Sequence, residues 1–406
     1  MDWRFHRLEE LTEPSRPITY GVVKPGPEDP KNGVKFIRGG DIFEGRLAIE
    51  NLRTITTKVS NSYSRTLLSG GELVVSLVGN PGHVAVVPKS LAGANLARQA
   101  GLVALRNEID VNFVKYFLMS PQGRAELFAQ MTGSVQVVIN LHNLKTVRVP
   151  LPSLPVQQRI ADILSTYDEL IENSQQRIGV LEAIARALYR EWFTHFRFPG
   201  YENVSRIASP LGDIPQGWEV RRLGEIAEDM RRNVPKGELE EPTPYVGLEH
   251  IPRRALALDA WETVTELGSN KFEFKKGEIL FGKIRPYFHK CSVAPFDGVC
   301  SADTIVIRAR HPEYYATVVA CVSSDAFVAE ASATANGAKM PRANWDVLEK
   351  YQLVIAKGDV AHRFSALLTD ILAKQAALIF KIRNLRRTRD LLLPRLLSGQ
   401  IEVKFD

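Results

Sequence analysis

Residue types that could perform catalysis are present, but none falls into a spacing typical of a catalytic site. The chain has no GxxxxGK[ST] phosphate loop, no GxGxxG after a strand, no HExxH and no Gly-x-Ser-x-Gly, so the usual nucleotide-binding and hydrolytic motifs are missing. The Asn-Pro-Pro-Tyr tetrapeptide associated with amino-methyltransferases is also absent. The glycines of Gly79–Gly82 favour a tight turn, and the histidines are scattered. A chain of this length without a catalytic cluster indicates a binding function.

Composition sets the class of protein. The 406 residues allow two to three domains, and the net charge of +6 permits a polyanionic partner. The three cysteines have no CxxC spacing, which favours reduced thiols over disulfides or a zinc site. The N-terminal segment lacks an apolar signal region, and no run of eighteen apolar residues occurs. We therefore expect a cytoplasmic protein without a membrane span.

Two long segments must position any binding residues, namely 151–193 and 359–398. Apolar side chains recur at spacings of three, four and seven, which predicts long helices with a seam for a partner helix. The predicted seam residues are Ile160, Ile163, Tyr167, Leu170, Leu181 and Leu188 in the first segment, and Phe364, Ile371, Leu378, Leu385 and Leu392 in the second. A helix of about 38 residues is roughly 57 Å long. The partner helix could belong to the same chain or to another subunit.

The rest of the chain repeats along with the helices. Matching segments are Trp3–Leu11 with Trp218–Ile226, Phe36–Ile42 with Tyr245–Ile251, Ser69–Val74 with Lys275–Leu280, and Leu102–Arg106 with Thr304–Arg308. Residues 34–37, 72–78, 84–87 and 102–105 predict strands, and residues 111–119 and 123–131 predict helices. Because strands and helices do not alternate regularly, the predicted class is α+β. The chain is thus a globular region followed by a long helix, twice over.

Predicted boundaries follow from this repeat. They are a first globular region at 1–150, a long helix at 151–195, a linker rich in Pro, Gly and Ser at 196–216, a second globular region at 217–356 and a second long helix at 357–406. The fold prediction is two mixed globular domains of pseudo-repeat symmetry, separated and joined by two long antiparallel coiled-coil helices.

Five short segments stand out along the chain, namely the proline-rich helix entry Pro150–Leu164 with its Gln-Gln-Arg-Ile-Ala run, Asp168–Glu172, Ala187–Phe193, Gly277–Tyr287 and Arg389–Gly399. With these segments the arrangement resembles the specificity subunit of type I restriction-modification systems. These motifs follow in the family's order over essentially the whole chain. Each is modest alone, but together with the duplication they are specific.

The resemblance implies two target-recognition domains, each reading one half of a split, asymmetric site in double-stranded DNA. It also implies helices that act as a spacer and as the docking surface for two methyltransferase subunits, with restriction/translocase subunits joining the assembly. S-adenosylmethionine, ATP and Mg²⁺ would belong to those partners, and this chain would be non-catalytic with no cofactor or metal of its own. A rigid rod suits this role, since half-sites one turn of duplex apart lie roughly 34–36 Å from each other. Because Leu77–Pro81 differs from Lys283–Tyr287, the two copies should read different bases.

Base reading calls for side chains that form paired hydrogen bonds, such as Arg to guanine and Asn or Gln to adenine, held on loops of a rigid scaffold. Candidates in the second copy are Arg285, Tyr287, His289, Lys290, Lys339, Arg342 and Asn344; in the first copy they are Arg38, Asn80, His83, Ser134, Gln136, Asn140 and His142. Each could equally be a solvated surface residue. The basic run Arg383, Arg386, Arg387 and Arg389 could be a solvated helix face, a phosphate contact or the mate of an acidic partner.

Two other classes of function stay open at this point. One is a nuclease that uses scattered carboxylates and Mg²⁺, which the missing motifs disfavour. The other is a coiled-coil adaptor between proteins without sequence-specific DNA binding. Affinity for DNA that falls as salt rises would separate a DNA reader from such an adaptor.

Overall fold

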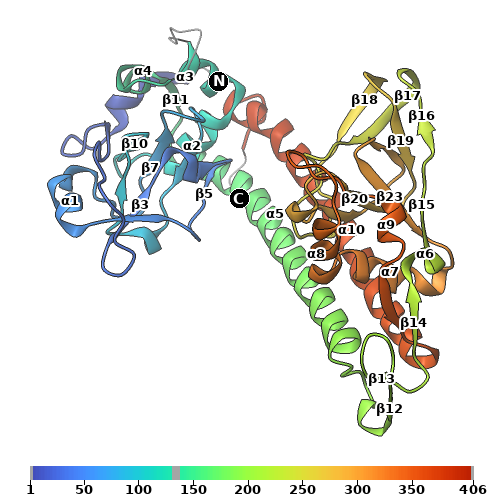
Figure 1. Ribbon diagram of the computed structural model, residues 1–406. Coiled ribbons are helices and arrows are strands. Elements are labelled where there is room, and N and C mark those ends of the chain that lie inside the picture. The colour runs from blue at the N-terminus through green and yellow to red at the C-terminus, as the bar shows by residue number, and fades with distance from the viewer. Residues whose placement is uncertain (1–2, 130–137, 404–406) are drawn as a thin grey trace. The chain divides into compact units, whose positions relative to one another are not determined.

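The computed structural model describes residues 3–129 and 138–403 (Figure 1). The chain divides into two compact units. Unit 1 comprises Met1–Leu170 together with Leu385–Asp406, and unit 2 comprises Ile171–Asn384. Unit 1 is therefore assembled from both ends of the chain, whereas unit 2 is one continuous stretch.

Two long helices supply segments to both units. Helix α5 (Leu154–Tyr189) has 36 residues and continues into a five-residue π-helical turn. Pro155 lies in its first turn, where a missing N–H costs no helical hydrogen bond. Helix α10 (Gly358–Leu397) has 40 residues, and Gly399 beyond it has a φ of 70°, as is common after a helix C-terminus. The prediction of two long helices is confirmed.

The two helices run antiparallel in each unit. In unit 1, Leu164 near the start of α5 belongs to one apolar cluster with Leu393 and Leu397 at the end of α10. In unit 2, Phe193 just after α5 packs on Phe364 near the start of α10, with ring centroids 4.6 Å apart. The predicted antiparallel pairing of the helices is therefore confirmed.

The buried face of α5 differs from the predicted seam at one position, Leu170. Of the predicted seam residues, Ile160, Phe364, Ile371 and Leu378 are buried, and Ile163, Tyr167, Leu181, Leu188, Leu385 and Leu392 are half-buried. Leu170 is 40% exposed, whereas the adjacent Ile171 is 3% exposed. Placing Leu170 in the seam was wrong. Because both residues are apolar, the sequence did not decide which of them faces inward.

Unit 1 is built on small sheets with mostly antiparallel pairing. Its four-stranded sheet has the order β2-β10-β7-β8 (Thr19–Tyr20, Ala100–Val103, Leu73–Ser76, Val84–Val86), its three-stranded sheet has the order β6-β3-β9 (Arg53–Ile55, Val34–Ile37, Asn95–Leu96), and β1 (Arg4–Arg7) pairs with β11 (Arg148–Leu151). The unit also contains β4 (Ile42–Phe43), β5 (Arg46–Leu47), α1 (Thr57–Ser62), α2 (Val111–Met119), α3 (Pro121–Phe128) and α4 (Leu141–Thr146). The four strands and the helix predicted at 111–119 are present. The helix predicted at 123–131 is present as α3, which ends at Phe128, and residues 130–131 lie outside the described residues.

Unit 2 has the same plan with longer strands. Its four-stranded sheet has the order β15-β23-β20-β21 (Ala227–Asp229, Thr304–Ala309, Ile279–Gly282, Cys291–Val293), and β14 (Glu219–Arg222) pairs with β24 (Gln352–Ile355). A five-stranded sheet has the order β16-β19-β22-β17-β18 (Asn233–Val234, Lys271–Phe274, Gly298–Ser301, Gly237–Val246, Glu262–Leu267), and the short helices are α6 (Leu223–Ile226), α7 (Tyr315–Val322), α8 (Asp325–Ala333) and α9 (Trp345–Leu348).

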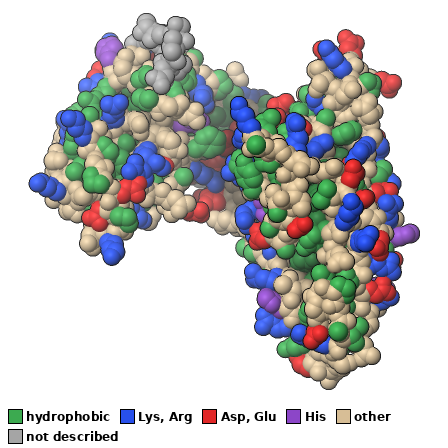
Figure 2. All heavy atoms as spheres, viewed as in Figure 1, with side chains coloured by type: hydrophobic (Ala, Val, Ile, Leu, Met, Phe, Trp, Pro, Cys, Tyr) green, Lys and Arg blue, Asp and Glu red, His purple; other side chains and the backbone are tan. Residues whose placement is uncertain are grey.

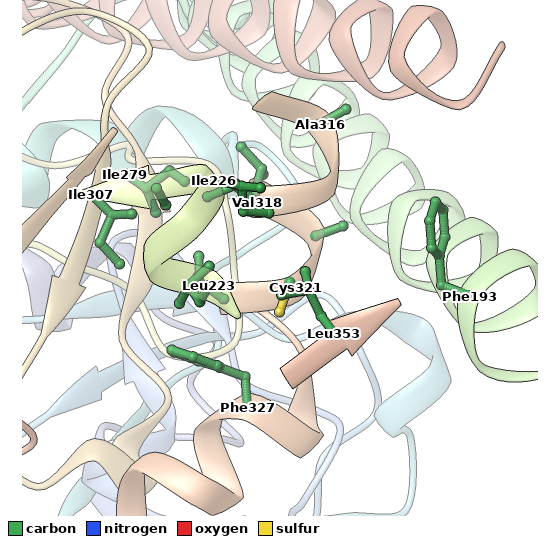
Figure 3. Close-up of a cluster of buried hydrophobic side chains, with 14 of the residues drawn as sticks. Phe193, Leu223, Ile226, Ile279, Ile307, Ala316, Val318, Cys321, Phe327 and Leu353 are labelled. Atoms are coloured by element: carbon green, nitrogen blue, oxygen red, sulfur yellow. The ribbon is translucent and has the colours of Figure 1, made fainter. Parts of the chain in front are cut away.

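The core of unit 2 gathers side chains from the sheet and from the helices. Figure 3 shows Ile279 and Ile307 of the four-stranded sheet near Ile226 of α6 and Val318 of α7, all of them buried. Among the described residues no single helix has the length and apolarity to cross a membrane; only the bent pair Pro312–Val322 and Asp325–Ala333 meets that test jointly.

Strand pairing confirms the internal duplication. Strands β3 and β9 pair in parallel with Phe36 opposite Asn95, and strands β17 and β22 pair in parallel with Tyr245 opposite Val299. Phe36 and Tyr245 are the positions that the repeat in the sequence matched. The two units therefore share a topology that includes an uncommon parallel pair among antiparallel neighbours.

One predicted match is off by two residues. Leu73 pairs with Val103 in unit 1, and its counterpart Ile279 pairs with Ile307 in unit 2. Val103 therefore corresponds to Ile307, whereas the sequence match placed it on Ile305. A shift of two keeps every side chain on the same face of a strand, so the alternating pattern alone could not reveal the error.

The predicted linker is a folded segment. Phe198 is 3% exposed and stacks on Trp218, with ring centroids 5.0 Å apart. A short hairpin follows, in which Ile207 pairs with Ile214. Prolines and glycines interrupt the helical pattern here, as predicted, but the aromatic residues between them anchor the segment to unit 2.

A buried ion pair recurs in both units. Glu72 is 4% exposed; its carboxylate accepts from Arg16 at 2.8 Å and from the backbone N–H groups of Ser69 at 2.6 Å and Gly70 at 2.8 Å. In unit 2, Glu278 is 5% exposed and binds Arg232 and the Lys275 N–H in the same way. The carboxylate thus fixes the turn that leads into the central strand.

Replacing Glu72 by Ala should destabilise unit 1 strongly. The change removes the acceptor of two backbone N–H groups and the carboxylate paired with Arg16, which keeps only its bond to Leu67 O; this loss costs on the order of 3 kcal/mol. Urea unfolding of the Glu72→Ala variant and of the exposed control Glu50→Ala measures the difference. We expect little change for the control, and near-native stability of Glu72→Ala would contradict the structural role of the ion pair.

Candidate nucleic-acid interface

Two loop segments meet at one edge of each globular region. In unit 2, the β20–β21 loop lies beside the segment before α9, because Arg285 N–H donates to Pro341 O at 2.8 Å and Ala343 N–H donates to Lys283 O at 2.9 Å. In unit 1, Ile139 N–H donates to Leu77 O at 3.0 Å, which joins the β7–β8 loop to the segment before α4. The structure therefore brings the candidates on these two loops of unit 2 into one neighbourhood.

The backbone has a positive φ at two positions in each of the two equivalent loops, and the residue types at these positions differ. Gly79 and Gly82 have φ values of 93° and 86°, and Arg285 and His289 have φ values of 50° and 53°. Left-handed backbone is unstrained for glycine but costs other residues about 1–2 kcal/mol. Strain of this kind concentrates at functional loops. Among the described residues, Arg285 and His289 share positive φ with three other non-glycine residues, namely Glu44, Phe196 and Arg254.

Arg285 presents an unpaired donor at this loop. Its guanidinium carbon lies 5.9 Å from the Phe288 ring centroid, and its Nε is buried without a hydrogen-bond partner among the described residues. Tyr287 at the loop tip is 55% exposed. A buried donor without an acceptor is costly, so the half-buried Arg285 side chain is incompletely hydrogen-bonded in the described structure.

The neighbouring segment adds exposed cations. Lys339 and Arg342 are exposed, and Arg342 Nη2 lies 3.7 Å from Asp303 Oδ1. Asn344 is exposed as well, but its Oδ1 caps α9 by accepting from the Asp346 N–H at 3.1 Å. Lys339 is therefore exposed to reach an anion, Arg342 would exchange its exposed Asp303 contact for one, and Asn344 caps a helix in addition.

His289 and Lys290 face the protein in this structure. His289 is 6% exposed, and its Nε2 lies 2.8 Å from Ser323 O. Lys290 Nζ donates to Leu248 O, and burial, with the nearby Arg253 charge, lowers the pKa of Lys290. These two side chains hold the base of the loop, so the sequence prediction that they read bases does not fit their present placement.

In unit 1, the candidate Arg38 is tied to a carboxylate. Its Nε and Nη2 donate to Asp41 at 3.1 and 2.9 Å, and this hydrogen bonding raises the pKa of Arg38. The pair lines an open pocket of about 520 Å³ together with Arg53, Arg98 and Gln99. Sequence reasoning missed Arg98 and Gln99, although a polar pair between two buried apolar runs was the signal that could have found them.

The other unit 1 candidates are spread over the loops. Asn80 is exposed at the tip of the β7–β8 loop; the His83 ring lies 5.0 Å from Phe43, and burial lowers the pKa of His83. Asn140 caps α4 through the Asn143 N–H at 2.8 Å, and His142 is exposed. Ser134 and Gln136 lie outside the described residues.

The basic run of α10 is divided among several tasks. Arg389 Nη1 donates to Asp168 Oδ1 at 2.6 Å, and Arg383 lies 4.0 Å from the Trp261 ring centroid. The sequence allows three roles for this basic run. For Arg389 the structure shows pairing with an acidic residue, and that residue, Asp168, belongs to the same chain. On the face shown in Figure 2, other Lys and Arg side chains are interspersed with acidic ones.

The part of the chain that the structure describes contains no cluster of metal ligands beside these loops. Among residues 3–129 and 138–403, no group of three or more His, Cys, Asp or Glu side chains is placed to hold a metal ion. The three cysteines are buried and free, and burial raises the pKa of the Cys300 and Cys321 thiols to about 12. The interface as described is suited to binding an anionic ligand through arginine, lysine and tyrosine.

A family model, curated proteins and a solved structure that are similar to this chain all carry names of type I restriction-modification specificity domains or subunits. Residues 2–183 match the family described as Type I restriction modification DNA specificity domain. The chain is 23% identical to the type I restriction enzyme MjaIX specificity subunit of Methanocaldococcus jannaschii over 99% of this chain and 94% of that protein, and 31% identical to the EcoBI specificity subunit of Escherichia coli over 50% of this chain and 45% of that protein. The crystal structure of the S subunit from M. genitalium covers 98% of this chain and 96% of its own at a TM-score of 0.60 and 16% identity, which shows a shared fold.

Replacing Arg285 by Gly should give a more stable protein than replacing it by Ala. Glycine adopts the observed φ of 50° without the clash that a Cβ makes. We expect the free energy of unfolding in urea to be about 1 kcal/mol higher for the Gly variant. As a control, Arg308→Gly should be less stable than Arg308→Ala, since glycine weakens a strand. Equal stability of the two Arg285 variants would exclude backbone strain at this position.

Proposed function

We propose that this chain, a relative of the specificity subunits of type I restriction-modification systems along its whole length, reads a bipartite, asymmetric site in double-stranded DNA. Each globular region would read one half-site. The observation that carries the proposal is that the two units share a topology, whereas their β7–β8 and β20–β21 loops differ in residues and length. Two domains that share a scaffold but carry different loop residues are suited to bind two half-sites of different sequence.

The chemistry of the loops suits base reading combined with phosphate contact. Arg285 can donate two hydrogen bonds to guanine O6 and N7, and the amide of Asn80 can pair with adenine. The exposed Lys339 and Arg342 would bind phosphates and thereby position unit 2 without specifying sequence. His289 would support the loop from beneath rather than touch a base. We assign no catalytic step to this chain.

The helices offer surface for partner subunits. Val180 and Ile184 of α5 are 60% and 48% exposed, and Leu391 of α10 is 60% exposed. Exposed apolar residues on a helix pair favour the addition of further helices. We infer that two methyltransferase subunits dock here and that restriction/translocase subunits join them. These partners would supply S-adenosylmethionine, ATP and Mg²⁺, in the cytoplasm where the DNA is accessible.

A map of methylated bases tests the proposal directly. Cells that express this chain with its methyltransferase partner should show a split, asymmetric motif that is absent when this chain is omitted. The control is the partner alone at equal abundance. An active and bound partner that produces no motif would favour the coiled-coil adaptor instead.

Replacing Arg285 by Ala should affect one half-site only. Loss of a paired contact to guanine costs about 1–3 kcal/mol of discrimination at that base, so methylation should spread to sites altered in one half while the other half stays strict. Arg363→Ala, an exposed arginine on α10, serves as the matched control. Equal loss of specificity in both halves would contradict the assignment of one half-site to each unit.

A further inference from the structure

The open pocket of unit 1 is lined by three arginines, Arg38, Arg53 and Arg98, and we call it the arginine pocket. It adjoins the β7–β8 loop, because the turn at Gly39 packs against the start of that loop. A Cβ added at Gly39 would lie only 3.0 Å from Val78 O. A ligand that contacts the β7–β8 loop of unit 1 therefore has the arginine pocket beside it.

Two of the three arginines are oriented by carboxylates. Arg38 donates to Asp41 through Nε and Nη2 at 3.1 and 2.9 Å, and Arg53 donates to Glu28 through Nε. Each carboxylate occupies one edge of its guanidinium group and leaves other N–H groups available to a further acceptor. The two pairs thus supply fixed donors, while their charges largely cancel.

Arg98 provides the uncompensated charge. It is exposed in the β9–β10 loop, and its side chain has no ion-pair partner within residues 3–129 and 138–403. Its backbone is held in place, since the Arg98 N–H donates to Val22 O at 2.9 Å. A phosphate group has oxygens that point in several directions and accepts strong hydrogen bonds from arginine. It therefore suits three separate guanidinium groups better than the single edge of a base does.

Unit 2 repeats the strands around this pocket, so the matched positions can be identified. Phe36 of β3 lies opposite Arg53 of β6, and Tyr245 of β17 lies opposite Glu262 of β18. Since Phe36 corresponds to Tyr245, Glu262 occupies the position of Arg53. An acidic residue thus replaces a basic one.

The turn that carries Arg38 is repeated as well. The Arg38 N–H donates to the Asp41 carboxylate at 2.7 Å, and the Gly247 N–H donates to His250 Nδ1 at 3.0 Å. Both turns span the same number of residues and follow the matched strands β3 and β17. Gly247 therefore occupies the position of Arg38 and offers no side chain to an anion.

The loop that carries Arg98 has a counterpart too. Directly after β7, the Leu77 N–H donates to Gln99 O at 2.8 Å; directly after β20, the Lys283 N–H donates to Asp303 O at 3.0 Å. Asp303 therefore occupies the position of Gln99.

The charge at the matched positions is inverted between the two units. The replacements in unit 2 are Gly247 for Arg38, Glu262 for Arg53, Ala302 for Arg98 and Asp303 for Gln99. In unit 2, Asp303 attracts a cation of the same chain, since Arg342 Nη2 lies 3.7 Å from its carboxylate. The same place in the shared scaffold thus favours an anion in unit 1 and a cation in unit 2.

We propose that the arginine pocket of unit 1 binds one phosphate group of the DNA backbone and that unit 2 has no such site at the matched position. The proposal rests on the proposed function, because it takes the ligand to be the DNA that unit 1 reads. A phosphate contact holds and positions a protein on DNA without specifying sequence. In unit 2 this task would fall to Lys339 and Arg342, which lie on a different segment. The two units would therefore hold the DNA backbone at different places of one scaffold.

The first test removes the uncompensated arginine. Affinity of the full chain for a short duplex of arbitrary sequence is measured as a function of salt for the native protein, Arg98→Ala and Arg98→Lys. Each phosphate contact adds about 0.9 to the slope of log affinity against log salt, so the native protein should lose about 3.5-fold more affinity than Arg98→Ala between 50 and 200 mM salt. Arg98→Lys keeps the charge and should keep most of the native slope.

Arg106→Ala is the matched control. Arg106 is an exposed arginine beyond the opposite end of β10 from Arg98, so its loss changes the net charge equally without touching the pocket. We expect a native slope for Arg106→Ala. Equal slopes for the native protein and Arg98→Ala, or equal losses in Arg98→Ala and Arg106→Ala, would overturn the proposal.

A second measurement separates phosphate binding from base reading. Methylated sites are mapped in cells that express Arg98→Ala together with the methyltransferase partner. We expect the same motif as for the native chain, with less methylation at each site. A motif that relaxes at one base would show that Arg98 reads a base and would overturn the phosphate assignment.

The remaining outcomes separate this proposal from the proposed function. A native chain that directs a split motif, with an unchanged salt slope in Arg98→Ala, keeps the proposed function and refutes the phosphate site. A native chain whose binding to duplex DNA does not depend on salt refutes both. Binding of inorganic pyrophosphate that is lost in Arg98→Ala, with an unchanged slope for DNA, would assign the pocket to a free ligand and also overturn the proposal.

Discussion

The burial of one apolar helix stripe against another is the interaction on which both units depend. Helix α5 covers α10 through Leu164 and Leu393 in unit 1 and through the Phe193 and Phe364 rings in unit 2. Each globular region packs onto that pair, so its core is completed by a helix segment that belongs to the other copy of the repeat. Neither copy of the module, taken as a stretch of sequence, contains its full core.

The duplication separates what the scaffold needs from what the loops are free to vary. The buried pairs Arg16–Glu72 and Arg232–Glu278 hold the same turn in both units. A few residues further along, glycines in one loop are replaced by Arg285 and His289 in the other, and all four positions have positive φ. The second loop therefore accepts strain that the first avoids, and it places larger side chains at the same edge of the fold.

The periodicity of apolar residues made the long helices and the repeat predictable from the sequence. Where two alternatives have the same apolar pattern, the sequence could not decide between them. Leu170 and Ile171 are both apolar, and only packing decides between them. Likewise, the alternating pattern of a strand is unchanged by a shift of two residues, so the sequence could not decide whether Val103 corresponds to Ile305 or to Ile307. The candidate loops followed from turn chemistry and donor types, but the inward orientation of His289 depends on Ser323, which lies 34 residues further along. Contacts between distant residues of this kind leave no local pattern.

The way in which the two units are distributed along the chain has a consequence for folding during translation. Unit 2 is a continuous stretch, Ile171–Asn384, and all of its residues are available before synthesis ends. Unit 1 has to wait for Leu385–Asp406, although most of it is made first. During that interval the face of α5 around Leu164 lacks the α10 residues that cover it in the folded protein, and apolar surface exposed in this way favours aggregation. The half that is translated first is thus the half that finishes folding last.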